Sequence, residues 1–248
     1  MLLTEIYIFI VLILSSFLQT TTGFGYAIIT APLLALVLGA KETVMLVMLT
    51  GLIVRLFLIR AIKNEGSFKA ILPLITASVF GAIPGAYVMT IISSDGLKIF
   101  IGIVLLIATA TMWKNCTIRV RHQKFVETIV GALSGFLATT TSINGPPIVL
   151  YYLNSNAEEN KVVFRANLTR YFLLINIASI IISYFAGTFK IEELWTYVLF
   201  SIPALYIGFY LGEKFFHRIN AEVLRKVSIL MVFVSSIMIV ATVLIKYL

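Results

Sequence analysis

Charged residues are scarce in this sequence, and their scarcity excludes an ordinary soluble domain. Only 12% of the 248 residues are charged, whereas 60% are hydrophobic. Folded soluble domains carry roughly 25% charged residues. The apolar residues lie in long blocks, most of them near the ~20 residues with which a helix crosses a bilayer. Because lipid offers no partner to an unpaired backbone group, these blocks are predicted to form transmembrane helices.

Side chains that carry catalysis or bind metals are also few. The one cysteine, Cys116, excludes an internal disulfide and a cysteine-based metal motif. Both histidines, His122 and His217, lie in basic loops, and no carboxylate lies deep within an apolar block. A Walker-type phosphate loop is absent, which excludes an ATP motor in this chain. We therefore expect no enzyme activity, no cofactor and no metal site.

The apolar blocks form two groups of four. They cover residues 6–38, 43–59, 70–92 and 97–113, and then 126–153, 162–186, 194–211 and 224–244. Similar stretches recur in the two groups, such as FLQTTT at residues 17–22 and FLATTT at residues 136–141. These matches predict an internal duplication. The predicted organisation is an N-terminal repeat at 1–113, a basic cytoplasmic linker at 114–125 and a C-terminal repeat at 126–248.

Paired glycines four residues apart are a second recurring feature. They are Gly81 and Gly85, Gly131 and Gly135, and Gly208 and Gly212. Such spacing places both glycines of a pair on one helix face and lets a neighbouring backbone approach closely, so we expect these pairs to be helix-packing faces.

The first block of each group is overlong and broken in its middle. As one straight helix, residues 6–38 would measure about 50 Å, well beyond the ~30 Å of hydrocarbon. The interruptions are TTTGFG at residues 20–25 and TTTSINGPP at residues 139–147. Each broken block is predicted either to return as a re-entrant hairpin or to cross the membrane once as a kinked helix.

The basic residues, which give a net charge of +8, favour the hairpin. With single crossings the loop Lys and Arg residues divide nine to eight between the two sides, whereas hairpins divide them thirteen to four. Basic loops mark the cytoplasmic side. Each half then has one hairpin and three spans, and the odd number of spans makes the halves inverted repeats. This loop placement also argues against a nucleic-acid partner.

The two breaks are the predicted substrate site. Irregular backbone survives at membrane depth only where protein or a watery cavity surrounds it, and half-helix N-termini attract anions. Threonine hydroxyls would add donors from each half, although they could instead bond back to their own helices. The candidate residues in the breaks are Thr20, Thr21, Thr22, Gly23, Gly25, Thr139, Thr140, Thr141, Ser142, Asn144, Gly145 and Pro146.

Three arginines in or near the blocks need separate interpretations. Arg170 lies about 12 Å into its block by helix rise, and an intramembrane Arg suggests function unless it reaches out to the membrane surface. Arg165, closer to the cytoplasmic end, is predicted to line the vestibule, whereas Arg55 is expected to extend its charge to the membrane surface. Asn167 and Asn176 share the block of Arg170 and are candidates for polar lining.

Two stretches resemble the signatures of the sulfite exporter TauE/SafE family, also called the TSUP permeases. Residues 16–32, with TGFG at 22–25, resemble the first signature, and residues 131–147, with NGPP at 144–147, resemble the second. Family members often have three glycines where this chain has GFG at 23–25, and GGP where it has NGP at 144–146. The resemblance extends over nearly the whole chain and implies transport of sulfite, sulfonates, or related sulfur-containing or organic anions.

These features together predict an all-α polytopic membrane protein that acts as a secondary permease. It would move a small anion across the cell inner membrane by rocking one half against the other. Its expected partners are the anion and the lipid bilayer, with a homo-oligomer left open. The alternative is an anion channel, or an accessory membrane subunit without a transport cycle of its own.

Overall fold

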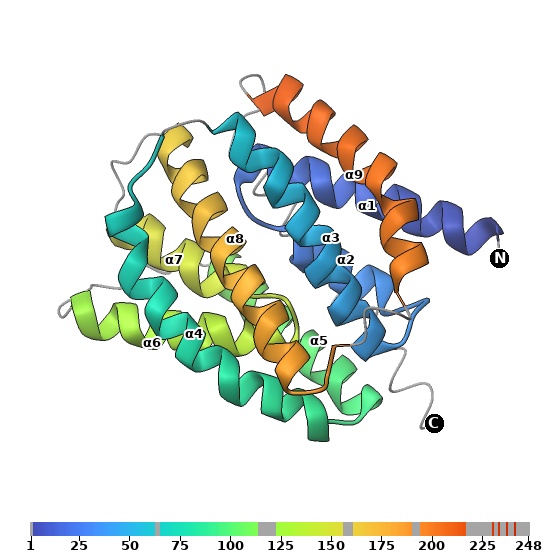
Figure 1. Cartoon of the computed structure of the whole chain (residues 1–248), viewed down its shortest axis with the longest axis horizontal. Coiled ribbons are helices and arrows are strands. Elements are labelled where there is room, and N and C mark those ends of the chain that lie inside the picture. Colours follow the sequence, from blue (N-terminus) through green and yellow to red (C-terminus); the bar gives the residue numbers. More distant parts are fainter. Residues whose placement is uncertain are drawn as a thin grey trace.

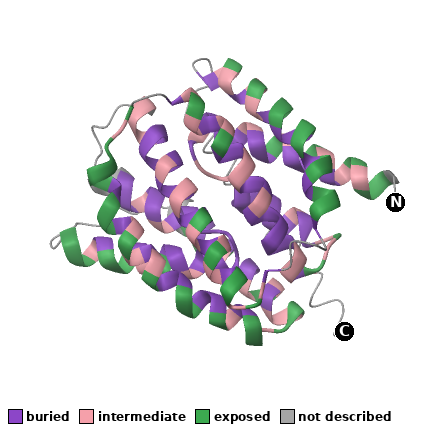
Figure 2. Cartoon of the chain, viewed as in Figure 1, coloured by how far each residue is buried: buried purple, intermediate pink, exposed green. Residues whose placement is uncertain are grey.

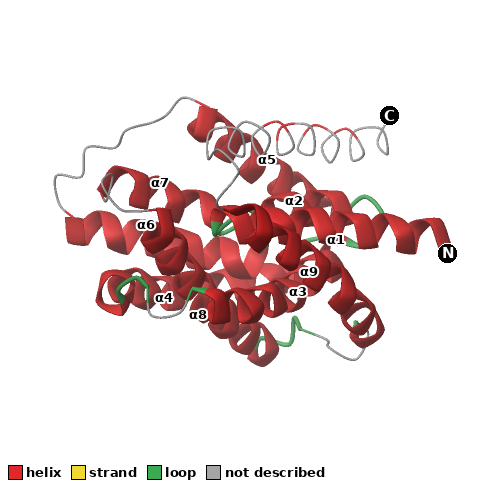
Figure 3. Cartoon of the chain, turned by 90° about the horizontal axis from the view of Figure 1, so that it is seen from above, coloured by secondary structure: helices red, strands yellow, loops and turns green. Residues whose placement is uncertain are grey.

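The computed structural model describes residues 2–62, 65–113, 123–155, 161–189 and 194–216, together with residues 230, 233, 237 and 241. In this part of the chain the nine continuous helices are α1 (Leu2–Thr22), α2 (Tyr26–Leu34), α3 (Ala40–Ala61), α4 (Phe68–Ile91), α5 (Ser94–Trp113), α6 (Gln123–Thr140), α7 (Gly145–Ser155), α8 (Lys161–Phe185) and α9 (Trp195–Phe216). Short described loops join α1 to α2, α4 to α5 and α6 to α7, and Figure 3 draws the described loops in green. Because α6 begins at Gln123, the predicted linker is helical over its last three residues; residues 114–122 lie outside the described residues, as does most of the last apolar block.

Five of these helices are long and apolar enough to cross a membrane. They are α1, α3, α4, α8 and α9. Buried residues concentrate in the middle of the bundle around α2 and α3, and exposed residues lie on the outer helices (Figure 2). Many of the exposed side chains are large and apolar, including Phe80, Tyr87 and Phe185, as lipid-facing surfaces require. The prediction of an all-helical polytopic membrane protein is confirmed.

Both broken blocks turn back as hairpins. The Tyr7 hydroxyl near the start of α1 donates to the Leu33 carbonyl near the end of α2, at 3.0 Å. Likewise the Tyr151 hydroxyl on α7 donates to Glu127 Oε1 near the start of α6, at 2.7 Å. In one continuous helix Tyr7 and Leu33 would lie about 39 Å apart. The alternative of a single kinked crossing is therefore wrong for the backbone of either block.

Each hairpin packs against the opposite half of the chain. Helix α1 lies along α9, and α6 lies along α4, while α3 and α8 run side by side in opposite directions in the centre (Figure 1). The paired glycines make these contacts: a Cβ at Gly135 would collide with the Ser78 carbonyl on α4, and one at Gly208 with the Ile13 carbonyl on α1. Their prediction as packing faces is confirmed. The inverted relation of the two halves stays a prediction.

Candidate anion site

The first break is held open by the side chain of Gln19. Gly23 and Gly25 have φ angles of 82° and 98°, a left-handed conformation that glycine adopts without a steric cost. Gln19 Nε2 donates to the Gly23 carbonyl at 2.9 Å, and Gln19 Oε1 accepts from the Tyr26 N–H at 3.3 Å. The amide of Gln19 thus supplies hydrogen bonds to the backbone on both sides of the break, at Gly23 and Tyr26. Helix α2 therefore begins inside the bundle.

The second break is tied to both halves. Ser142 has a φ of 60°, uncommon for a residue with a side chain, and its hydroxyl donates to the Val44 carbonyl of α3 at 3.1 Å. The Thr141 hydroxyl oxygen accepts from the Ile143 N–H at 3.1 Å. Helix α7 then begins at Gly145, so a second helix N-terminus lies within the protein.

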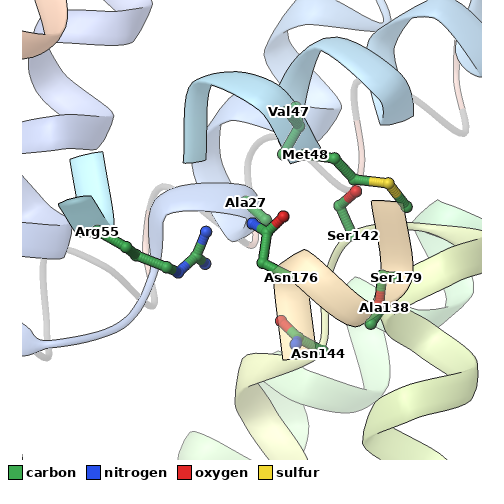
Figure 4. A pocket seen from close by; sticks show the side chains of 9 residues that line it. All are labelled: Ala27, Val47, Met48, Arg55, Ala138, Ser142, Asn144, Asn176 and Ser179. Atoms are coloured by element: carbon green, nitrogen blue, oxygen red, sulfur yellow. The ribbon is translucent and has the colours of Figure 1, made fainter. Parts of the chain in front are cut away.

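Two small cavities adjoin between the breaks. The larger and the smaller have about 270 and 210 Å³ of space between atoms, open solvent included, and about 10 Å³ in each is accessible to the centre of a water molecule. Ala27, Arg55 and Asn144 line both of them. The larger is also lined by Val47, Met48, Ala138, Ser142, Asn176 and Ser179 (Figure 4), and the smaller by Gln19, Gly25, Tyr26, Ile28, Ile143, Gly145 and Phe172. The side chains come from both halves of the chain.

Arg55 is the cation of this site. Its side chain is only 5% exposed, and its Nε is buried without a hydrogen-bond partner in the described residues. The guanidinium carbon lies 5.6 Å from the centre of the Phe172 ring, and no described carboxylate lines either cavity. A Cβ at Gly51 would come within 2.5 Å of Arg55 Nη1, so the glycine one turn earlier makes room for the guanidinium.

Two helix N-termini face the same space. The first turn of α2, from Tyr26 to Ile28, and the first residue of α7, Gly145, all line the smaller cavity. The first four N–H groups of a helix have no partner within it, and the N-terminus is the positive end of the helix dipole. The site is therefore positive and rich in donors, which suits a small anion.

The chain also matches a known family over most of its length. The family described as sulfite exporter TauE/SafE matches residues 8–239. The chain belongs to the sulfite exporter TauE/SafE family. No curated protein and no solved structure matches it significantly. At the level of the family, TauE/SafE membership implies a membrane transporter, a permease for sulfite or related sulfur-containing anions.

In this TauE/SafE protein four predicted site residues meet at the cavities. They are Gly25, Ser142, Asn144 and Gly145. Pro146 instead lines a separate apolar pocket between α5, α6 and α7. Gly23 lies behind the first break against Arg165, whose Cα would be 3.1 Å from a Cβ at that position.

The predicted threonines do not line the cavities. Most of their hydroxyls donate to main-chain carbonyls: Thr21 to Phe17 at 3.0 Å, Thr22 to Leu18 at 2.7 Å, Thr139 to Ala82 at 2.9 Å, Thr140 to Phe136 at 2.8 Å and Thr141 to Leu137 at 3.0 Å. Thr20 is fully buried next to Gly212 of α9. Four of these threonines, Thr21, Thr22, Thr140 and Thr141, therefore bond back to a carbonyl of their own helix, as the alternative interpretation expects. The Thr139 hydroxyl instead donates to the Ala82 carbonyl of α4.

The two arginines predicted for the site lie outside the cavities. Arg165 forms an ion pair with Glu213, donates to the Thr20 carbonyl at 3.0 Å and places its guanidinium carbon 3.7 Å from the centre of the Phe216 ring. Arg170 lies beside Gly66 in the loop between α3 and α4, where a Cβ would be 2.8 Å from its Nη1.

Asn167, considered for the polar lining, accepts a hydrogen bond from the Ser67 N–H at 2.7 Å. It thus braces the same loop as Arg170. Asn176, the other asparagine considered, does line the larger cavity.

Several lining residues were missed from the sequence, and Arg55 is the most important. From the sequence, its charge is expected to extend to the membrane surface. That interpretation is wrong, since α3 occupies the centre of the bundle and buries this side chain. The same reasoning that selected Arg170, a charge within an apolar block, would also have selected Arg55.

The ion pair between Arg165 and Glu213 leads to a stability prediction. Replacing Glu213 with Gln leaves the Arg165 side chain, which is 5% exposed, without its counter-charge, so we expect a loss of about 1–3 kcal/mol in unfolding free energy. Thermal unfolding of the purified protein in detergent measures the effect. Lys214→Gln, at the exposed neighbouring position, is the matched control. Equal melting temperatures for the two variants would show that the pair contributes nothing.

Proposed function

We propose that this chain is a secondary permease that carries a small sulfur-containing oxyanion, sulfite or a sulfonate, across the cell inner membrane. The observation that carries the proposal is Arg55, whose buried Nε has no protein partner in the described residues and whose surroundings hold no described carboxylate. A buried charge without a partner is costly. An anion between the two hairpins would supply the missing charge.

The chemistry of the lining fits an oxyanion. The planar guanidinium of Arg55 offers a fork of donors that matches two oxygens of a sulfite or sulfonate group. Side-chain amides at Asn144 and Asn176 and the N–H groups of Ala27 and Ile28 in the first turn of α2 can donate to the remaining oxygens. With only about 10 Å³ accessible to the centre of a water molecule in each cavity, the site excludes drug-sized ligands, and the surrounding helices would have to move apart to admit an oxyanion.

The position of the site suits alternating access. The cavities are lined from both hairpins and from α3 and α8, so a movement of one half against the other would change which membrane surface they face. A channel would need a continuous path instead. The distinction is kinetic, and it can be measured on the reconstituted protein.

The test is flux in proteoliposomes under anaerobic conditions, with sulfite, sulfate, sulfoacetate and acetate as separate probes. For a permease we expect uptake of sulfite or sulfoacetate that saturates and that accelerates when the same anion is loaded inside. Uptake that rises linearly without acceleration by internal anion would identify a channel. Uptake of acetate alone would overturn the sulfur-oxyanion assignment while leaving transport intact.

A further inference from the structure

One face of α8 carries polar side-chain oxygens that have no hydrogen-bond partner among the described residues. Asn176, Ser179 and Ser183 are 9%, 1% and 3% exposed, and Oδ1 of the first and Oγ of the two serines are buried and unpartnered. Their spacing of three and four residues places them on one helix face. Together they extend over about 10 Å of the helix axis.

This face is directed toward α3. Asn176 and Ser179 line the larger cavity together with Val47 and Met48 of α3 (Figure 4). Because α3 and α8 run in opposite directions (Figure 1), the next turn of α8 lies level with the first turns of α3. The polar face therefore leads from the cavity toward the end of the bundle where α3 begins and α8 ends.

The first turns of α3 supply another polar group of the same kind. Thr43 is fully buried, and its hydroxyl is also without a partner in the described part of the chain. Arg55 lies over Phe172, and Val47 and Ser179 both line the larger cavity. Counting along the two helices in opposite directions from these points, we infer that Thr43 lies near the level of Ser183. Both helices thus contribute unpartnered hydroxyls beyond the cavity.

Ser15 and Thr20 in α1 also have buried hydroxyls without a partner in the described residues, but several other buried hydroxyls in the long helices behave differently. Those of Thr50, Thr109, Thr169 and Ser201 donate to the carbonyl one turn back in their own helix, at 2.6, 2.8, 2.7 and 2.5 Å. That bond is the simplest way to satisfy a hydroxyl in an apolar environment. An unpartnered one costs free energy, so a run of them on one face calls for partners such as water or an anion.

We propose that Asn176, Ser179 and Ser183, with Thr43 opposite, line the path that the anion follows between the Arg55 site and the membrane surface at the start of α3. This inference rests on the proposed function. Hydroxyl and amide groups can replace part of the hydration shell of an anion without holding it as a second arginine would. Near the opposite end of α8, the ion pair between Arg165 and Glu213 joins α8 to α9.

Cysteine accessibility tests the path, in a background with Cys116→Ser. Ser179→Cys and Ser183→Cys change one atom each, so the fold should be kept. The cysteine thiolate, which forms in water and not in lipid, attacks a methanethiosulfonate reagent, forms a mixed disulfide with it and displaces methanesulfinate. At each position we compare an anionic reagent, sulfonatoethyl methanethiosulfonate, with a cationic trimethylammonium analogue. The matched control is Ile181→Cys, a position between the two serines that is 50% exposed on the outer surface of the bundle.

We expect both serine positions to react with the anionic reagent at least ~10-fold faster than Ile181→Cys, because only they meet water. The preference for the anionic reagent should fall when Arg55→Gln is added. Rates equal to that of Ile181→Cys would overturn the path and leave the Arg55 site untouched. Fast reaction without an anionic preference, and without an effect of Arg55→Gln, would keep the path and contradict the anion site of the proposed function.

Discussion

Arg55→Gln is expected to weaken binding of the transported anion by about 100-fold or more. The guanidinium supplies two charge-assisted hydrogen bonds to an oxyanion, each worth about 1.5–3 kcal/mol, and 1.4 kcal/mol is tenfold in affinity. Arg55→Lys should retain part of the binding, since the charge remains and the fork of donors is lost. Isothermal titration calorimetry with sulfite or sulfoacetate measures the affinity of both purified variants.

The same substitution should have an opposite effect on the empty protein. Arg55 is 5% exposed and its Nε lacks a partner in the described chain, so removing its charge should leave thermal stability unchanged or raise it. The variant would then melt at or above the wild-type temperature and lose the stabilisation that the anion gives.

Arg60→Gln is the control for these measurements, because Arg60 is exposed and donates to the Leu56 carbonyl of its own helix. Normal affinity in Arg55→Gln, or equal losses in both variants, would contradict the site.

Gly135→Ala is expected to cause the largest loss of stability. A Cβ at Gly135 would collide with the Ser78 carbonyl group and Cα, which are backbone atoms of α4 and cannot rotate away. Overpacking of this kind costs about 1–3 kcal/mol or more. The collision would also disturb Ser78, whose hydroxyl donates to the Gly131 carbonyl at 2.9 Å and lies 2.5 Å from the Tyr171 hydroxyl oxygen.

Gly145→Ala makes the same chemical change at a roomier position. There a Cβ would meet only Ile28 Cδ1 and Phe172 Cζ, both at 3.8 Å. We expect this variant to keep its melting temperature, whereas Gly135→Ala melts lower and elutes poorly as a single species in size-exclusion chromatography. Equal melting curves would show that α4 and α6 do not approach as closely as described.

Local chemistry made much of the fold predictable. Glycines at positions 23 and 25 need no side-chain room at positive φ, and the two prolines after Gly145 suit the first turn of a helix. Breaks therefore follow from the residues themselves. The basic loops favoured hairpins, and the hydrogen bonds from Tyr7 to Leu33 and from Tyr151 to Glu127 confirm that the chain reverses.

The composition of the site was less predictable, and the threonines illustrate the reason. A threonine in a helix can offer its hydroxyl to a ligand or to a carbonyl one turn back, and the sequence is the same in both cases. The Thr140 hydroxyl donates to the carbonyl one turn back, that of Phe136, at 2.8 Å. Ser179, with no such bond, lines the larger cavity.

By itself the sequence determined that the chain is helical, that it lies in a membrane and that two helices are broken, because these properties depend on hydropathy and on local backbone preference. Only the tertiary structure decided which cation serves the site. Arg55 and Arg170 are the same residue type in similar apolar blocks, but Arg55 faces the breaks whereas Arg170 lies beside the loop at Gly66. The physical reason is that the neighbours of a side chain depend on how α3 and α8 pack within the bundle, which periodicity along one helix does not specify.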